Sequence, residues 1–351
     1  MRSSDQFLSV GMASDCRYAE ELYDLVPLHV FQWIYIITST ASIFLVIYTA
    51  RHYLHRTIFE NVTKELIIAL YVLITIYSVC LIFAQGSQLV YRYIAPTKCD
   101  AQSPKIWCIF RFILTVITWS FVILHLGITF QHFLSSFLFG IRIQTIVSRI
   151  TIVFSFLYSL IFGVLAYYSD SLEGRTAYCS GFTTHSEGIL MFNLYLILVL
   201  DVLNTLFSIL LWKYNSQKFV TDRESYDLGR SFHRRQNLYA MEQFLPVSAL
   251  HSIFYVILFC EFYYHDYHTK MVITVTVYFS QALKSNMSPG WYLFTSVAAN
   301  VVPHYCLLCP LIFLVLIRRG RFKRVSHVQT MVNPERKPNE MYFNALHQQW
   351  Q

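Results

Sequence analysis

Ionisable side chains interrupt several long apolar runs of this sequence, which suggests that these side chains have a function. Arg111 and Glu261 carry opposite charges, and Asp201 is followed at helical spacing by Asn204. A charge in hydrocarbon is costly, so such a residue is expected to face a partner, a ligand or the membrane surface. For Arg111 and Glu261 three interpretations remain open: an ion pair, contact with a ligand, or snorkelling of the side chain to the interface.

Three histidines, His125, His251 and His304, lie in separate apolar runs. A single histidine in a helix bundle more commonly forms a hydrogen bond between helices than senses pH or binds a ligand. Their spacing suggests no metal site, and the sequence has no nucleophile with a partnered base, phosphate-binding loop or glycine-rich turn. We therefore expect no enzymatic activity, no cofactor and no nucleic-acid partner.

The overall composition indicates whether water or lipid surrounds the protein. Of 351 residues, 55% are hydrophobic and 13% are charged, whereas soluble domains average about 25% charged residues. This composition excludes an ordinary cytosolic enzyme, a disordered protein and a small disulfide-packed secreted protein. It predicts a protein solvated by lipid.

A helix needs about 20 mostly apolar residues to cross a bilayer. Seven runs qualify, at residues 28–50, 66–84, 112–130, 150–168, 188–212, 244–263 and 290–317. An eighth run, 271–283, is too short, and we assign it to an outer loop or a helix extension. The sequence therefore predicts an all-α membrane protein with a bundle of seven transmembrane helices.

The distribution of basic residues predicts the orientation. With the N-terminus outside, about two thirds of the 27 lysines and arginines fall in cytoplasmic segments, as the positive-inside rule requires. We expect an extracellular segment 1–27, a membrane domain 28–317 and a basic cytoplasmic tail 318–351, in a multi-pass protein of the plasma membrane. Basic residues beside the membrane also favour contact with anionic lipid.

Four of the eight cysteines, Cys16, Cys99, Cys108 and Cys179, fall on the expected outer side. An even set of cysteines in an oxidising compartment suggests disulfides, although some could remain unpaired. Of the three pairings, we favour Cys108 with Cys179 and Cys16 with Cys99, because Cys108 opens the third span and Cys179 lies in the loop after the fourth. Asn286 begins an outer glycosylation sequon that Pro289 weakens.

The order of several short motifs resembles that of nematode serpentine chemoreceptors. The chain is most similar to the alpha/beta class (Srab), with the related alpha (Sra) and epsilon (Sre) classes close behind. The motifs are Cys16-Arg17-Tyr18-Ala19; Phe59-Glu60-Asn61; Cys99-Asp100 with Cys108 and Arg111; Tyr178-Cys179; Leu228, Phe232 and Asn237; and Pro303-His304-Tyr305 with Pro310. The resemblance implies a G-protein-coupled receptor of rhodopsin-like architecture.

The sequence departs from the family at the inner end of the third span. The family usually has Glu-Arg there, whereas this chain has Gln131-His132. A Glu-Arg pair can hold an inactive state through charge-assisted bonds, so we expect a looser lock here and a change in basal signalling for His132→Arg. Other departures are Ser231, His233 and Gln236 in the third inner loop.

The resemblance implies a small environmental ligand outside and a heterotrimeric G protein inside, in the membrane of sensory neurons or cilia. Candidate ligand contacts are Arg111, Thr115, Trp119, Glu261 and Trp291. Candidate coupling residues are Gln131, His132, Arg142, Phe232, Arg234, Arg235 and Asn237, and candidate hinge residues are Pro246, Pro303 and Tyr305. Pairing with another receptor is left open, and the alternative function is a transporter or ligand-gated channel.

Overall fold

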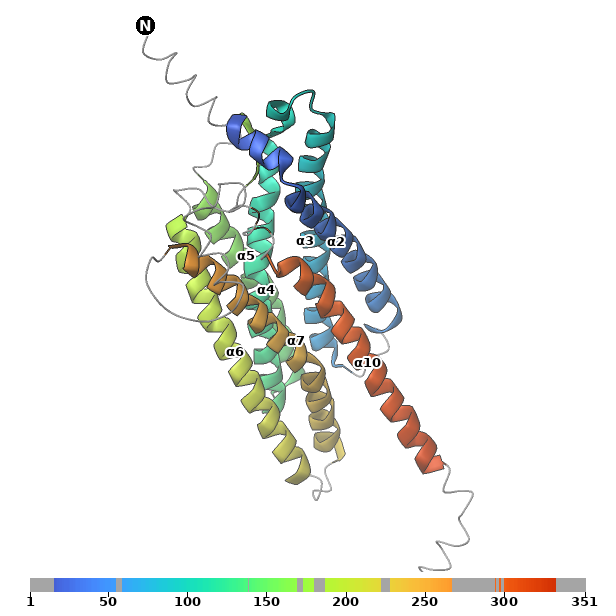
Figure 1. The fold of residues 1–351 in the computed structure, drawn as a ribbon. Helices are drawn as coiled ribbons and strands as arrows, with labels where there is room; N and C mark the ends of the chain where they lie inside the picture. The colour runs from blue at the N-terminus through green and yellow to red at the C-terminus, as the bar shows by residue number, and fades with distance from the viewer. Residues whose placement is uncertain are drawn as a thin grey trace, which may run out of the picture.

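The computed structural model describes residues 16–54, 59–137, 139–168, 173–179, 187–221, 228–266, 294, 297 and 300–332. Within these ranges the chain is a bundle of long helices (Figure 1). They are α2 (Val26–His52), α3 (Asn61–Ile94), α4 (Ile109–Ser136), α5 (Ile141–Tyr167), α6 (Glu187–Thr221), α7 (Leu228–Asp266) and α10 (Val302–Val332). Residues 16–24 form a further short helix.

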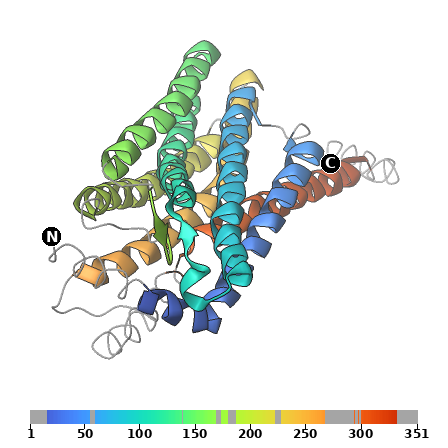
Figure 2. The ribbon, with the colours of Figure 1, turned by 90° about the horizontal axis from the view of Figure 1, so that it is seen from above.

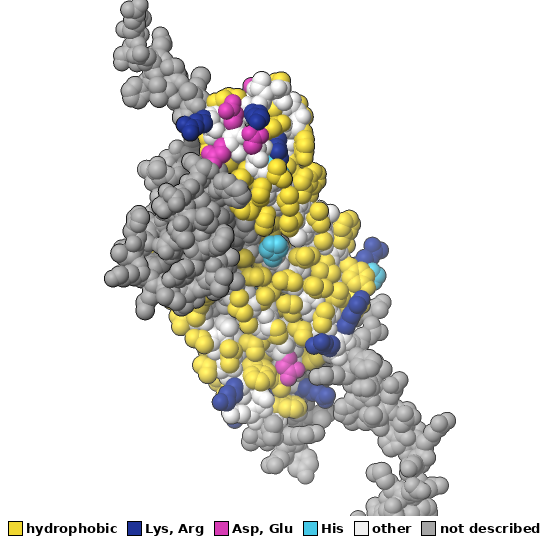
Figure 3. Space-filling view, viewed as in Figure 1, with side chains coloured by type: hydrophobic (Ala, Val, Ile, Leu, Met, Phe, Trp, Pro, Cys, Tyr) yellow, Lys and Arg dark blue, Asp and Glu magenta, His cyan; other side chains and the backbone are white. Residues whose placement is uncertain are grey.

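Six helices are long and apolar enough to cross a membrane within the described residues, namely α2 to α6 and the first part of α10. Large apolar side chains such as Phe44 and Leu210 are 69% and 65% exposed on their outer faces, which lipid can cover and water would penalise. Figure 3 shows this apolar surface between a charged upper end and a basic lower end. The 39-residue α7 packs against α6, α4 and α10 as the seventh long helix.

The centre of the bundle is α4, which contacts α3, α5, α6 and α7. Glycines allow α4 and α5 to lie close together: a Cβ at Gly127 would overlap Thr151, and one at Gly163 would lie 2.6 Å from Val116 Cγ2. Small residues at helix contacts are typical of membrane bundles, where close backbone packing replaces the hydrophobic effect.

The predicted seventh span, 290–317, is interrupted in the structure. Asn300 and Val301 are not helical, and α10 begins at Val302, whose N–H donates to Asn300 Oδ1 at 3.3 Å. Pro303 therefore lies in the first turn of a helix, where its missing N–H costs little, and does not kink a continuous span. The helix then continues past residue 318 to Val332, so no break in the helix marks the expected start of the tail.

One end of the bundle carries the short elements. There the 3-10 turns Lys98–Ala101 and Lys105–Cys108 flank strand β1 (Ser103–Pro104), which pairs antiparallel with β2 (Arg175–Thr176). Figure 2 looks onto this end and shows the two strands side by side. We call it the disulfide end, because both disulfides lie there, and we call the opposite end the basic end.

Candidate functional site

The short N-terminal helix is fastened to the disulfide end of α3. A disulfide joins Cys16 to Cys99, and Lys98 Nζ lies 2.6 Å from Asp24 Oδ2. Arg92 donates to the carbonyl of Tyr23 at 2.7 Å. The hydrogen bond that Lys98 donates to Asp24 raises the pKa of Lys98, although an exposed ion pair adds little stability by itself. The disulfide and the contacts of Arg92 and Lys98 therefore hold this short helix against the end of α3.

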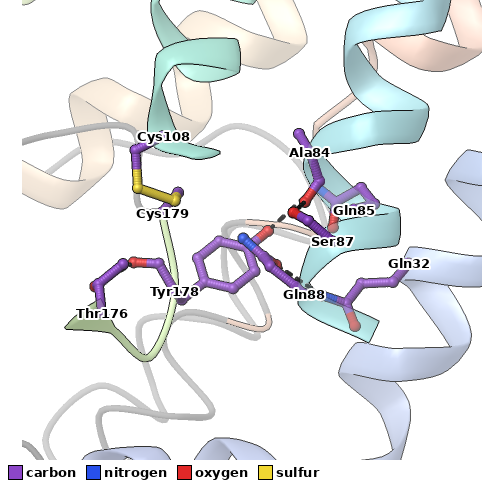
Figure 4. Close-up of a disulfide and its surroundings, with 9 residues drawn as sticks. All are labelled: Gln32, Ala84, Gln85, Ser87, Gln88, Cys108, Thr176, Tyr178 and Cys179. Carbon is purple, nitrogen blue, oxygen red and sulfur yellow. Dashed lines mark hydrogen bonds between the residues drawn. A yellow bond between two sulfur atoms is a disulfide. The ribbon is translucent and has the colours of Figure 1, made fainter. Parts of the chain in front are cut away.

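The second disulfide, Cys108–Cys179, fixes the start of α4 to the loop after α5 (Figure 4). These are the two pairings favoured from the sequence. Beside it Tyr178 points toward α3, and its hydroxyl lies 3.5 Å from Gln85 Nε2. Burial raises the pKa of Tyr178 to about 12, so its hydroxyl stays neutral and can both donate and accept a hydrogen bond.

Three of the predicted ligand contacts lie along one side of α4. Thr115 Oγ1 lies 3.2 Å from the hydroxyl of Tyr167, and the guanidinium of Arg111 lies 4.7 Å from the centre of the same ring. Trp119 is buried and meets Phe162 edge to face. The facing aromatic residues belong to α5, which the sequence reasoning did not select. The side chain of Glu261 and all of Trp291 lie outside the described residues.

A buried polar network crosses the middle of the bundle. His251 Nδ1 of α7 lies 2.9 Å from Asp201 Oδ1 of α6, and Ser252 Oγ donates to Asp201 Oδ2 at 2.6 Å. The ring of His251 stacks on His125 of α4 with centroids 4.2 Å apart. His125 Nε2 lies 2.7 Å from the hydroxyl of Tyr305 of α10. The network therefore joins four helices, and two of the three histidines act between helices as expected.

A second polar cluster lies near the basic end of α4. His132 Nδ1 lies 2.9 Å from Asn237 Oδ1 of α7, so Nδ1 donates to the amide oxygen. Asn237 Nδ2 donates to Ser136 Oγ at 2.9 Å, and Asn215 Nδ2 of α6 donates to the same oxygen at 2.7 Å. All four side chains are buried. We call His132, Ser136, Asn215 and Asn237 the amide clasp, because hydrogen bonds of the two asparagine amides join α4, α6 and α7.

The other predicted coupling residues belong to α4, α5 and α7. Gln131 Nε2 donates to Gln144 Oε1 of α5 at 2.6 Å. Arg142 and Arg235 are exposed and Arg234 is half-buried, whereas the side chain of Phe232 lies outside the described residues. Asn286 also lies outside them.

Sequence reasoning missed Ser136, Asn215 and Gln144, although each is an uncharged polar residue near one end of an apolar run. That position was the available signal, but a polar residue near a helix end is also common where the chain leaves the membrane. Among the predicted hinge residues, Tyr305 is buried in the central network, Pro303 opens α10 and Pro246 lies inside α7. In the described part of the chain no three His, Cys, Asp or Glu side chains are grouped to hold a metal ion.

Long apolar helices with polar networks between them define a multi-pass membrane protein of the helix-bundle class. Comparison with protein families then identifies the group: the family model for the serpentine type 7TM GPCR chemoreceptor Sra matches residues 13–350. The chain therefore belongs to this family of seven-transmembrane receptors, which is one of the three related classes that the sequence motifs resemble. A comparison with curated proteins finds no match.

Proposed function

We propose that this protein is a chemosensory receptor that binds a small ligand at its disulfide end and activates a heterotrimeric G protein at its basic end. The observation that carries the proposal is the amide clasp. A ligand can act only by favouring one arrangement of the helices over another, and the clasp provides contacts among α4, α6 and α7 that a rearrangement can break.

The positions of the disulfides and basic residues support an extracellular N-terminus. Cys16–Cys99 and Cys108–Cys179 lie at one end of the bundle, as expected of an oxidising compartment. Arg142, Arg235 and Arg318 are exposed at the other end, which suits the cytoplasm. In this orientation Arg111, Thr115 and Trp119 belong to the ligand-binding side, and the sequence alone proposes Glu261 and Trp291 as further contacts.

Expression in a reporter cell with a promiscuous G protein and a panel of volatile and water-soluble compounds tests the function. Ligand-evoked signalling that requires the G protein supports the receptor. The alternative of a transporter or channel predicts ligand-dependent flux from purified protein in liposomes without a G protein. In the structure Asp201, the acid in the middle of α6, already contacts His251 and Ser252, which favours the receptor.

Breaking the amide clasp should raise basal signalling. Asn237→Ala removes the acceptor of His132 Nδ1 and one donor to Ser136, and a buried unpaired group costs about 1–3 kcal/mol. If this cost falls mainly on the inactive arrangement, the active fraction rises about 5- to 150-fold. His132→Arg should act in the same direction, because it places a cation where neutral groups now meet.

The measurement is G-protein activation without ligand, normalised to receptor at the cell surface. Thr145→Ala is a matched control, because Thr145 is half-buried and its hydroxyl donates to the Ile141 carbonyl of its own helix. Wild-type basal activity in both Asn237→Ala and His132→Arg, at normal surface level, would show that the clasp does not restrain activation.

A further inference from the structure

At the basic end, the last turn of α2 and the middle of α10 share a charged patch that the proposed receptor mechanism leaves unused. Arg318 donates through Nε to the hydroxyl of Tyr53 at 2.9 Å and through Nη2 to the hydroxyl of Tyr48 at 3.1 Å. Its guanidinium carbon lies 5.4 Å from the centre of the Tyr53 ring. Neutral acceptors and an aromatic face therefore orient this cation while its charge remains.

Further basic residues lie next to these positions in the sequence of α2 and α10. Arg51, His52 and Arg319 are exposed, and the ring of His52 lies 4.9 Å from that of Tyr48. We call Arg51, His52, Arg318 and Arg319, with Tyr48 and Tyr53, the tyrosine–arginine patch. Figure 3 shows basic side chains and a histidine down the right-hand side of the lower half of the molecule, with an acidic side chain among the lower ones.

Two acids at the same end of the bundle have other partners. Glu60 Oε1 lies 2.8 Å from His233 Nδ1, and Glu65 Oε1 lies 3.5 Å from Arg149 Nη2. These carboxylates are therefore held at α7 and α5. The patch thus offers a concentration of positive charge to an anionic group from outside the chain.

The surface that leads to the patch faces lipid. On α2, Phe44 and Ile47 are 69% and 54% exposed, and on α10, Leu311 and Val315 are 39% and 41% exposed. These side chains lie on the same helices, one to two turns deeper in the membrane region. Tyrosines are enriched where hydrocarbon meets headgroups, which is where Tyr48 and Tyr53 would lie.

We propose that the tyrosine–arginine patch binds the headgroup of an anionic phospholipid that carries more than one negative charge, such as a phosphorylated inositol. Guanidinium groups recognise phosphate oxygens through paired hydrogen bonds. The acyl chains of the same lipid lie along the exposed apolar faces of α2 and α10. The proposal uses the proposed orientation only to assign the lipid to the cytoplasmic leaflet.

The test uses the full chain in phosphatidylcholine nanodiscs that contain a small fraction of fluorescent phosphatidylinositol bisphosphate. Energy transfer from a dye on the protein reports lipid at the patch, and both faces of a nanodisc are accessible. We expect Arg318→Gln to weaken binding about fivefold, since each basic residue near the surface contributes about that factor. Tyr48→Phe with Tyr53→Phe keeps both rings but removes the two acceptors, and should weaken binding in the same direction.

Arg149→Gln is the matched control, because it removes an exposed arginine that lies beside Glu65 and away from the patch. It should leave lipid binding unchanged. Equal losses of lipid binding for Arg149→Gln and Arg318→Gln would show that binding depends only on the total positive charge. That result would overturn the proposed site. Equal competition by a soluble inositol phosphate would overturn the assignment to a lipid, because the acyl chains would then contribute nothing.

The measurement contains neither a G protein nor a sensory ligand. A receptor that fails to couple can therefore still bind the lipid, and a coupling receptor can still fail to bind it. Loss of G-protein activation in Arg318→Gln, with unchanged lipid binding, would assign the patch to a protein partner and overturn the proposal.

Discussion

Replacing Gly127 by leucine is expected to abolish folding of the bundle. A Cβ at this position would overlap the Thr151 side chain of α5, and leucine adds three further carbon atoms. The two helices would have to separate along an interface that also includes Gly163 against Val116. We expect a loss of more than about 4 kcal/mol, which is a large part of the stability of an ordinary domain.

Surface abundance in cells and thermal unfolding in detergent measure this effect. Gly86→Leu is the control, because Gly86 also lies within a long helix, α3, but a Cβ there meets nothing within 4 Å. Gly127→Ala should be rescued in part by Thr151→Ala, which removes the overlapping methyl group. Wild-type unfolding of Gly127→Leu would mean that α4 and α5 are not held this close.

The apolar runs predicted most of this fold. A helix that crosses a bilayer must satisfy its own backbone groups, so it needs a long apolar run that can be recognised in the sequence. The family comparison confirms the seven-span class. The predicted start of the last helix was wrong. Hydropathy does not detect the side chain of Asn300, which accepts a hydrogen bond from the N–H of Val302 where α10 begins. Glycine likewise has no signature for close packing, so the contact of Gly127 with Thr151 was not foreseen.

The sequence predicted that polar residues would form hydrogen bonds between helices, but it did not predict which residues would pair. Histidines in apolar runs suggested bonds between helices, and His125 and His251 do form them. Nothing in the spacing showed that His251 would meet Asp201, because these residues are 50 positions apart and lie on different helices. Arg111 and Thr115 could be placed on one side of α4 from helical periodicity, whereas their partner Tyr167 depends on how α5 packs.

Asp201 and His251 are both fully buried, with exposed fractions of 0%, and we expect unequal losses of stability when one or the other is replaced. His251→Leu leaves a buried carboxylate with Ser252 as its remaining described donor, and breaking a buried pair in this way costs about 3–5 kcal/mol. Asp201→Leu leaves a buried imidazole without this hydrogen-bond partner, so its cost should be smaller, about 1–3 kcal/mol. The double variant should be more stable than His251→Leu alone.

Thermal unfolding of the purified variants gives this order directly, and the double-mutant cycle gives the coupling between the two side chains. His304→Leu is the control, because it also replaces an imidazole by leucine. The ring of His304 is half-buried and packs against Tyr35. Additive losses would show that Asp201 and His251 are not energetically paired. If the double variant folds but no longer responds to ligand, the network is needed for signalling beyond its contribution to stability, because the apolar pair would hold α6 against α7 without the link through His125 to Tyr305.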